Sequence, residues 1–327
     1  MTYVAAKEAF SALFSNDLSF EEAQNLLIDL YERGESEEEI AAAAEVMRAN
    51  AIPLKVDEEL KSKLVDIVGT GGDKSGSFNI SSTVALLLAS TGCYVAKHGN
   101  RAITSKSGSA DMLEALGINL NLSPEKQADM LEQVGFTFMF AVNHHPAMKQ
   151  IMPIRRSLEH RSIFNILGPL TNPAGVQRYL LGVFDPAFIT KIANALNLLK
   201  SPNSLVVSSK DGMDEISISD ITYAAKVSNG IVTEREIDPQ SLGFTLHPFS
   251  EILGSDAASN AIITRDILEG KEIGAKRDIV LLNAAAALEV ANVARDMKEG
   301  IEIAKEAILS KKAQNHLEKI IKVSNSL

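Results

Sequence analysis

The pattern of apolar and polar residues along the chain changes near residue 64. Over the first 60 residues, apolar positions recur every three or four residues, which is typical of amphipathic helices. Ser19 followed by Glu22, and Ser36 followed by Glu39, have the spacing of capping boxes at helix starts. The first part of the chain is therefore predicted to be wholly helical.

From residue 64 onward, short apolar runs alternate with helical segments. The predicted strands lie at residues 65–68, 94–96, 136–140, 179–183 and 205–207. Ser123-Pro124, Asp185-Pro186 and Ser201-Pro202 each place proline just after a capping residue, which predicts three helix starts. A long apolar run at 277–294 predicts a buried helix.

Strands that alternate with helices form parallel βαβ units. The predicted fold class is therefore α/β: a small N-terminal helical domain plus a larger α/β domain with a mainly parallel central sheet flanked by helices. We expect the helical domain to comprise residues 1–63, joined by helices from about 146–164, and the α/β domain to comprise residues 64–327.

Composition narrows the class of protein. The chain has 327 residues, 46% of them hydrophobic, and a net charge of −10, which argues against nucleic acid as a partner. The single cysteine, Cys93, cannot form an internal disulfide and is expected to be a buried small residue in a reducing compartment. Without a signal-peptide pattern or an apolar run of roughly 18 residues, no membrane partner and a cytoplasmic location are expected.

Residues 69–76 contain four glycines, directly after a predicted strand. The P-loop pattern fails because no Gly-Lys pair is present, and the dinucleotide pattern fails because Lys74 replaces its third glycine. Backbone N–H groups, together with Ser77, Asn79, Ser81 and Ser82 near the next helix start, nevertheless suit an anion. The alternative is a glycine-rich turn with an ordinary helix cap, which explains fewer of these residues.

A second polar loop follows the next predicted strand, at residues 97–109. Its cations Lys97, Arg101 and Lys106 stand beside several hydroxyl groups, where a helix is expected to begin near Ser109. Charge-assisted contacts of this kind favour a polyphosphate. The alternative, a solvated basic loop, fits less well in an acidic chain.

Two further segments carry candidate chemistry. Asp214 and Glu215 are adjacent in a turn after a strand and suit Mg²⁺, although most such pairs are solvated surface charge. One of the three arginines Arg155, Arg156 and Arg161 could bind the carboxylate of a ligand bidentately. The alternative is that these arginines are ordinary surface charges on an exposed helix.

The sequence does not indicate a zinc site or an activated nucleophile. It contains no HExxH motif, no Cys and His residues at zinc-binding spacing and no GxSxG motif. The pair His144-His145 could bind a metal, but a shaped loop is the preferred interpretation because no third ligand is evident.

Seven ordered motifs between about Asp66 and Ala287 resemble the anthranilate phosphoribosyltransferase family. They are "GTGGD" (69–73), "FNISS" (78–82), "KHGNRAITSKSGSAD" (97–111), "HHPAMK" (144–149), "FNILGPLTNPAG" (164–175), "DGMDEIS" (211–217) and "LLNAAAAL" (281–288). The resemblance implies the fold of class II nucleoside phosphorylases and a homodimer formed through the N-terminal helical domain. The N-terminal region looks shorter than is usual in the family, and "SLEHRS" (157–162) departs from the family's pattern.

The resemblance implies transfer of the phosphoribosyl group of phosphoribosyl pyrophosphate to the amine of anthranilate, with release of pyrophosphate. This is the second step of tryptophan biosynthesis from chorismate. Residues implied to act directly are Lys97, His98, Asn100 and Arg155. Implied Mg²⁺ ligands are Ser81, Asp214 and Glu215. The substrate-binding set implied by the motifs is Gly69, Gly72, Asp73, Ser77, Asn79, Ile80, Ser81, Ser82, Lys97, His98, Gly99, Asn100, Arg101, Ala102, Ile103, Thr104, Ser105, Ser109 and Arg155.

Within that set, Gly69, Asn100 and Arg155 are expected to contact anthranilate, with His98 close by. Two other functions remain open at this point. One is a pyrimidine-nucleoside phosphorylase-like enzyme, which shares the implied fold and does not need the Asp-Glu pair. The other is a non-catalytic relative that binds nucleic acid through the basic loop.

Overall fold

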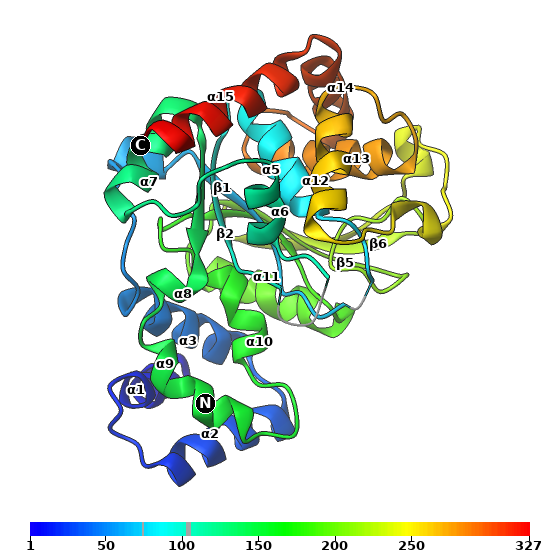
Figure 1. The fold of residues 1–327 in the computed structure, drawn as a ribbon. Helices are drawn as coiled ribbons and strands as arrows, with labels where there is room; N and C mark the ends of the chain where they lie inside the picture. Colours follow the sequence, from blue (N-terminus) through cyan, green and yellow to red (C-terminus); the bar gives the residue numbers. More distant parts are fainter. Residues whose placement is uncertain (74, 103–105) are drawn as a thin grey trace.

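A seven-stranded sheet forms the centre of the protein in the computed structural model, which describes residues 1–73, 75–102 and 106–327 (Figure 1). Its spatial order is β3-β2-β1-β4-β5-β6-β7. The strands are β1 (Leu64–Gly69), β2 (Tyr94–Gly99), β3 (Phe136–Phe140), β4 (Arg178–Gly182), β5 (Asn203–Ser209), β6 (Thr222–Ser228) and β7 (Ile231–Ile237). Strands β1 to β5 pair in parallel, whereas β6 and β7 are antiparallel, so the sheet is mainly parallel as predicted.

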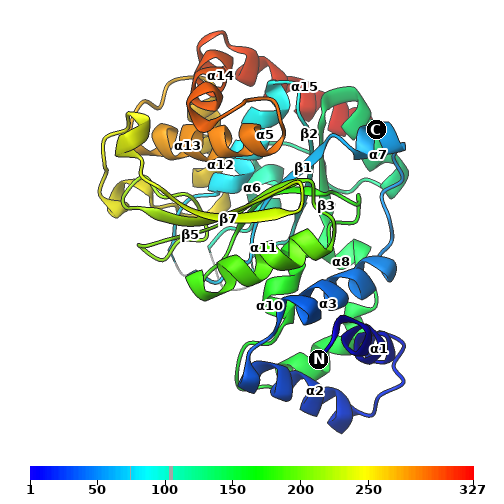
Figure 2. The ribbon, with the colours of Figure 1, turned by 180° about the vertical axis from the view of Figure 1, so that it is seen from behind.

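Helices cover both faces of this sheet (Figure 2). They are α1 (Tyr3–Phe14), α2 (Phe20–Arg33), α3 (Glu37–Ala49), α4 (Glu58–Lys61), α5 (Ile80–Ser90), α6 (Ser109–Ala115), α7 (Pro124–Val134), α8 (Ala141–His144), α9 (Met148–Arg156), α10 (Phe164–Leu167), α11 (Ile189–Leu198), α12 (Ala257–Leu268), α13 (Ala275–Val290), α14 (Met297–Leu309) and α15 (Lys312–Ser326). Short 3-10 turns lie at Gly168–Leu170, Pro186–Phe188, Gln240–Leu242 and Phe249–Ile252. Helices α5 and α13 pack on one face and α11 on the other, which confirms the α/β fold class.

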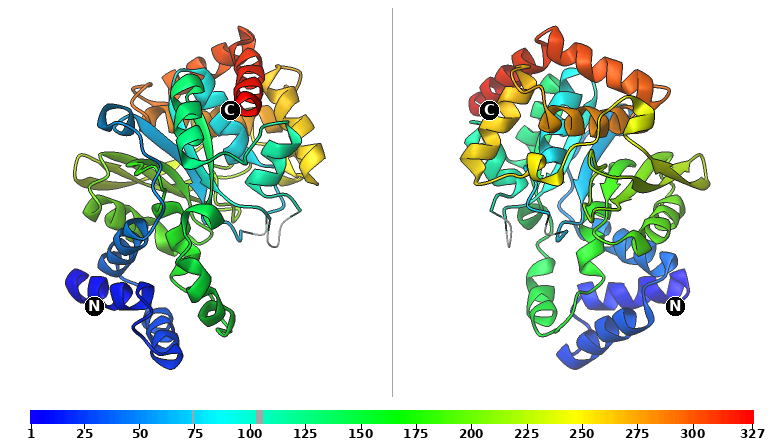
Figure 3. Two further views of the ribbon diagram at one scale, coloured as in Figure 1. Left: turned by 60° about the vertical axis from the view of Figure 1, so that its left-hand side comes forward. Right: turned by 90° about the vertical axis from the view of Figure 1, so that its right-hand side faces the viewer.

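The N-terminal helices form a separate projection beside the sheet (Figure 3). Helix α1 packs on α3, and α2 packs on α9, so residues distant in sequence share this helical layer. Both predicted capping boxes are present, at Ser19–Glu22 and Ser36–Glu39. Helix α3 buries most of its side chains between α1 and α11, and this continuous core joins the projection to the sheet.

Three other local predictions are confirmed. Cys93 is buried at the corner between α5 and β2. The apolar run near residue 277 forms α13, and nearly all of its side chains are buried. Pro124 begins α7 behind the capping residue Ser123. Among the described residues, no helix is long and apolar enough to cross a membrane.

The predicted helix start at Ser201-Pro202 is wrong, because β5 begins at Asn203. The Ser201 hydroxyl donates to the carbonyl oxygen of Gln177 at 2.6 Å, so it ties two neighbouring strands together and does not cap a helix. The β6–β7 hairpin was not predicted either. Most positions of its outer strand are exposed or half-buried, and the strand lacks an apolar run.

Glycine occupies the carboxyl-terminal end of three adjacent strands: Gly69 on β1, Gly99 on β2 and Gly182 on β4. A Cβ at Gly182 would overlap the backbone oxygen of Asp214, and one at Gly69 would overlap its carboxylate. A Cβ at Gly99 would overlap the Ser109 hydroxyl. The absence of side chains here lets two other segments approach the strand ends.

We predict that Gly182→Ala lowers the midpoint of thermal unfolding by at least about 4 °C, because backbone atoms of residue 214 cannot move aside cheaply. Differential scanning calorimetry measures the change. Gly168→Ala is the control, since a Cβ there meets no atom within 4 Å and its φ of −48° suits alanine. Equal midpoints for the two variants would contradict the prediction.

Candidate functional site

The carboxyl ends of β1, β2 and β4 meet at one edge of the sheet, where the strand order changes direction. Open α/β sheets bind ligands at such a position, because the loops after neighbouring strands diverge there. Three segments gather at this edge: the glycine loop (residues 69–73 and 75–79), the basic loop (residues 97–102 and 106–109) and the acidic turn (residues 211–215).

The acidic turn is held against the glycine loop by two hydrogen bonds. The backbone N–H of Gly71 donates to Oδ2 of Asp214 at 2.8 Å. The backbone N–H of Ser81, in the first turn of α5, donates to Oε1 of Glu215 at 3.2 Å. These bonds bring together residues 134 or more positions apart, as the sequence-based Mg²⁺ hypothesis requires.

Burial raises the pKa of both carboxyl groups. The pKa of Asp214 rises to about 7, first through burial and then through the charge of Asp73, while the Gly71 N–H opposes the rise. Burial and the neighbouring Asp214 raise the pKa of Glu215 well above its usual range. A divalent cation beside the two oxygens would compensate for the lost hydration of these charges.

The donor set fits Mg²⁺ held together with waters and substrate oxygens. Two carboxylates and the Ser81 hydroxyl are hard oxygen ligands of the kind that Mg²⁺ prefers. Among the described residues, no group of three or more His, Cys, Asp or Glu side chains could hold a metal by itself. A site of this composition would complete its coordination with water and a phosphate-bearing ligand.

Lys97 is the buried cation of the site and is only 2% exposed. Its Nζ donates to the carbonyl oxygen of Ile67 at 2.6 Å and to the Ser81 hydroxyl at 3.3 Å. Burial lowers its pKa, whereas the charges of Asp66, Glu215 and Asp214 oppose this shift. Lys97 therefore joins β2 to β1 and α5 through two hydrogen bonds, which hold its ammonium group in place.

Asp66 and Asn172 form a supporting network that the sequence analysis missed. The Asn172 amide donates to Oδ2 of Asp66 and to the carbonyl oxygen of Ala96, both at 2.8 Å. The backbone N–H of His98 donates to Oδ1 of Asp66 at 3.4 Å. Burial raises the pKa of Asp66 to about 6, and Lys97 opposes the rise. The sequence signal that could have indicated this network is the position of Asp66 within the otherwise apolar strand β1.

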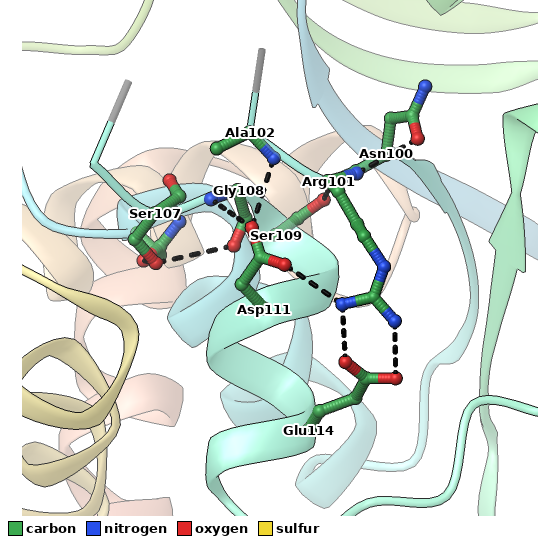
Figure 4. A network of polar contacts seen from close by, with 9 residues as sticks. Asn100, Arg101, Ala102, Ser107, Gly108, Ser109, Asp111 and Glu114 are labelled. Atoms are coloured by element: carbon green, nitrogen blue, oxygen red, sulfur yellow. Dashed lines mark hydrogen bonds and ion pairs between the residues drawn. The ribbon is translucent and has the colours of Figure 1, made fainter. Parts of the chain in front are cut away.

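The basic loop folds back onto α6 (Figure 4). Arg101 pairs with Glu114 at 2.6 Å and with Asp111 at 2.9 Å, so its guanidinium faces α6. Asp111 also accepts the N–H groups of Ala102 and Gly108 and thereby shapes the loop. Arg101 thus forms ion pairs with two acidic side chains of α6.

Ser109 and Asn100 stabilise the remainder of this loop. The Ser109 hydroxyl donates to the Asn100 carbonyl oxygen at 3.1 Å, beside Gly99 at the end of β2. Helix α6 begins at Ser109, as predicted. Three residues of the expected binding set, Ile103, Thr104 and Ser105, lie outside the described residues.

Four other members of the expected set lie in the core or in the glycine loop. Ile80 and Ser82 point into the core, with exposures of only 1% each. Ser77 pairs with Leu253 in an isolated antiparallel bridge. Asp73 is half-buried and accepts the N–H of Ser75 at 3.4 Å.

Arg155 lies at the end of α9, with its guanidinium 5.5 Å from the centre of the Phe164 ring. Burial lowers its pKa. Arg161, also considered in the sequence analysis, donates to the carbonyl oxygen of Gly72 at 2.9 Å and stacks 3.8 Å above Phe184. Arg161 therefore supports the glycine loop directly.

Two buried histidines lie at and near the start of the basic loop. His98 and His145 are both buried, with ring centres 5.2 Å apart. Burial is the first cause that lowers their pKa values, to about 3 and about 4 respectively, so both rings are neutral near pH 7. His144 instead joins Ile52 to Gln127 by hydrogen bonds of 2.7 and 3.0 Å, so it has a structural role, although it lies at the end of helix α8 and not in the predicted loop.

Comparisons with known proteins identify the family of this chain. Residues 61–314 match the model of the glycosyl transferase family, a/b domain. An anthranilate phosphoribosyltransferase from Rhodopseudomonas palustris (strain TIE-1) is 44% identical, over 99% of this chain and 94% of its own length. The chain belongs to the anthranilate phosphoribosyltransferase family.

Solved structures of this family superpose closely. The enzyme from Thermus thermophilus has a TM-score of 0.93 at 40% identity, covering 99% of this chain and 96% of its own. A family member from Saccharomyces cerevisiae, in complex with PRPP and Mg, has a TM-score of 0.87 at 26% identity. It covers 99% of this chain and 93% of its own.

The buried histidines predict acid sensitivity of the fold. The folded pKa of His145, about 4, lies below the unfolded value of about 6.5. Its contribution to stability is therefore fully present above pH 6.5 and is lost as the pH falls towards 4. Compared with His145→Gln, the wild type should lose about 2 kcal/mol more free energy of unfolding between pH 7.5 and pH 5.

Urea unfolding at pH 7.5, 6 and 5 measures this difference. The values at pH 7.5, where the ring is neutral in both states, provide the internal control for lost packing. Parallel pH profiles for the wild type and His145→Gln would show that the ring does not resist protonation.

Proposed function

We propose that this protein transfers the phosphoribosyl group of PRPP to the amine of anthranilate and releases pyrophosphate. Family membership supports the reaction class. The observation that carries the proposal is the convergence of Lys97, the glycine loop and the Asp214–Glu215 pair at one sheet edge. In a biosynthetic pathway, this reaction would be the second step from chorismate to tryptophan.

The leaving pyrophosphate needs positive charge and hydrogen-bond donors. We propose that Lys97 and the N–H groups of the glycine and basic loops receive the developing negative charge of the diphosphate. Because Lys97 is already held by Ile67 and Ser81, it would need little reorganisation during the reaction. Mg²⁺, when bound by Ser81, Asp214 and Glu215, would supply further charge stabilisation of phosphate oxygens.

The Mg²⁺ assignment draws support from two sources. The carboxyl groups of Asp214 and Glu215 have raised pKa values, which a cation would reverse. The yeast family member was solved with PRPP and Mg. Mg²⁺ is accordingly the cofactor that we propose.

On the acceptor side, the amine of anthranilate is neutral near pH 7 and attacks C1 of the ribose as the C1–O bond to pyrophosphate breaks. The nitrogen then loses one proton to solvent. We assign Asn100 and Arg155 to orient anthranilate, near Gly69. His98 is neutral and buried, so it would orient ligands and need not act as a strong base. A yeast family member bound to 4-fluoroanthranilate supports an aminobenzoate site.

The other substrate-binding residues named from the motifs remain part of the proposal. Their backbone groups, at Gly72, Asp73, Ser77 and Gly99 among others, would contact the ribose and its phosphates. Arg101 has a secondary place in this assignment because Asp111 and Glu114 already neutralise it.

We also propose a cytoplasmic homodimer. Residues 1–63 together with about 146–164 would form the helical domain through which two copies associate. Apolar side chains exposed on or beside these helices support that surface: Val4 is 65% exposed, Phe20 52% and Val142 69%.

The alternatives have less support. A pyrimidine-nucleoside phosphorylase would not need the paired acids that lie against the glycine loop. A nucleic-acid-binding role conflicts with the net charge of −10 and with the pairing of Arg101 inside the chain.

The proposed function is tested by the loss of anthranilate fluorescence in the presence of PRPP and Mg²⁺, with each component omitted in turn. We expect turnover only in the complete mixture. Phosphorolysis of a pyrimidine nucleoside, without consumption of anthranilate, would instead support the phosphorylase.

In the same assay, the double variant Asp214→Asn, Glu215→Gln should lose at least about 100-fold in kcat, since charge stabilisation of the leaving group is worth several kcal/mol. The matched control is Glu234→Gln, Glu236→Gln at exposed positions of strand β7, which likewise replaces two carboxyl groups by amides. An unchanged magnesium titration in the first variant would remove the metal assignment.

For Arg155→Ala, we expect KM for anthranilate to rise about 10- to 100-fold, corresponding to loss of a charge-assisted contact of about 1.5–3 kcal/mol. KM for PRPP should change less than about threefold. Arg156→Ala, at the exposed neighbouring position, is the control. Equal increases in both KM values would place Arg155 outside the anthranilate site.

A further inference from the structure

A segment far along the chain is paired with the glycine loop. This segment, which we call the strap, comprises residues 252–256 and leads into α12. The N–H of Phe78 donates to the Ile252 carbonyl oxygen at 3.2 Å, and the N–H of Gly254 donates to the Gly76 carbonyl oxygen at 2.9 Å. The two backbones lie so close that a Cβ at Gly254 would sit 2.5 Å from Cα of Phe78.

Asn260, in the first turn of α12, connects the strap to the side chain of Asn79. Its Oδ1 accepts the backbone N–H of Ser255 at 2.9 Å. Its Nδ2 donates to Oδ1 of Asn79 at 2.8 Å. Nδ2 of Asn79 then donates to the carbonyl oxygen of Ser107 in the basic loop, at 3.3 Å.

The donor and acceptor roles in this series of hydrogen bonds can be arranged in only one way. It begins at a backbone N–H, which can only donate, and ends at a backbone carbonyl, which can only accept. The orientation of both amide groups is therefore determined by fixed partners. Asn260 is 2% exposed, so water does not readily replace a lost partner.

Asn79 would ordinarily cap α5, since asparagine at the N-cap position accepts an N–H of the first turn. Here its side chain makes no capping hydrogen bond. Its Oδ1 accepts instead from Asn260 and from the Ser107 hydroxyl, the latter at 3.0 Å. The amide of Asn79 thus spans the gap between the glycine loop and the basic loop.

We infer that Asn260 is a positioning residue for the phosphoribosyl diphosphate site. It holds the Asn79 amide in one orientation and thereby sets the spacing between the two loops that enclose the ligand. Asn260 itself contacts Asn79 and the strap. The inference rests on the proposed function for its substrate and on the hydrogen bonds for its geometry.

The variants Asn260→Ala and Asn260→Asp test this role. Both should raise KM for PRPP at least about 10-fold, with kcat and KM for anthranilate changed less than about threefold. Asn260→Asp should be the more damaging, because a carboxylate oxygen would face Oδ1 of Asn79. If Asn79 rotated its amide in response, its own oxygen would face the Ser107 carbonyl.

Thr264→Val is the matched control on the same helix. It removes a buried hydrogen bond of 2.7 Å to Thr83 of α5 but leaves Asn260 and the Asn79 amide in place. Its melting temperature should fall while KM for PRPP stays within about twofold of wild type. If the Asn260 variants behave like Thr264→Val, or if Asp is tolerated as well as Asn, the positioning role is refuted.

Hydrogen exchange of the ligand-free protein separates this inference from the proposed function. Asn260→Ala should accelerate exchange in peptides covering residues 76–81 and 107–109 at least about fivefold, whereas Thr264→Val should not. A wild-type protein without anthranilate turnover would overturn the function, while accelerated exchange would still support the positioning role. Unchanged exchange would overturn the positioning role even if turnover is normal. Asn260→Ser serves the same measurement if the other variants do not fold.

Discussion

Close approach of the acidic turn to the ends of β1 and β4 is the constraint on which the site depends. The turn can reach the glycine loop only because Gly69 and Gly182 carry no Cβ. Gly99 provides the corresponding space for Ser109 at the end of β2. These three strands are neighbours in the sheet. Because none of the three glycines has a Cβ, loops from distant parts of the chain can meet in one continuous region at the strand ends.

Charge within this region is arranged before any ligand binds. Lys97 is fixed by a carbonyl and a hydroxyl oxygen, and the two acids of the turn are fixed by backbone N–H groups. Burial lowers the pKa of the lysine and raises the pKa values of the acids, so each charged form lacks hydration that a polyphosphate and a cation could replace. The site is thus electrostatically incomplete in the free protein, which favours binding of oppositely charged ligands together.

Local signals in the sequence predicted the fold class, several helix caps and the polar loops that meet at the sheet edge. These features depend on residues a few positions apart, as at Ser36 and Glu39. The partners that support the site depend on pairing across the fold: Asn172 lies 106 residues from Asp66, and Asn260 lies 181 residues from Asn79. No local pattern encodes such contacts. The prediction of a helix at Ser201 was wrong for the same reason, since its hydroxyl serves a neighbouring strand.

The link between the strap and the glycine loop has a consequence for protein synthesis. All strands of the sheet end by Ile237, whereas Asn260 follows them in the chain. All strands of the sheet have therefore been synthesised before the residue that holds the Asn79 amide. The hydrogen bond from Asn260 to Asn79 can form only after α12 has been synthesised, so this edge of the sheet is completed late in translation, together with the C-terminal helices that cover the sheet.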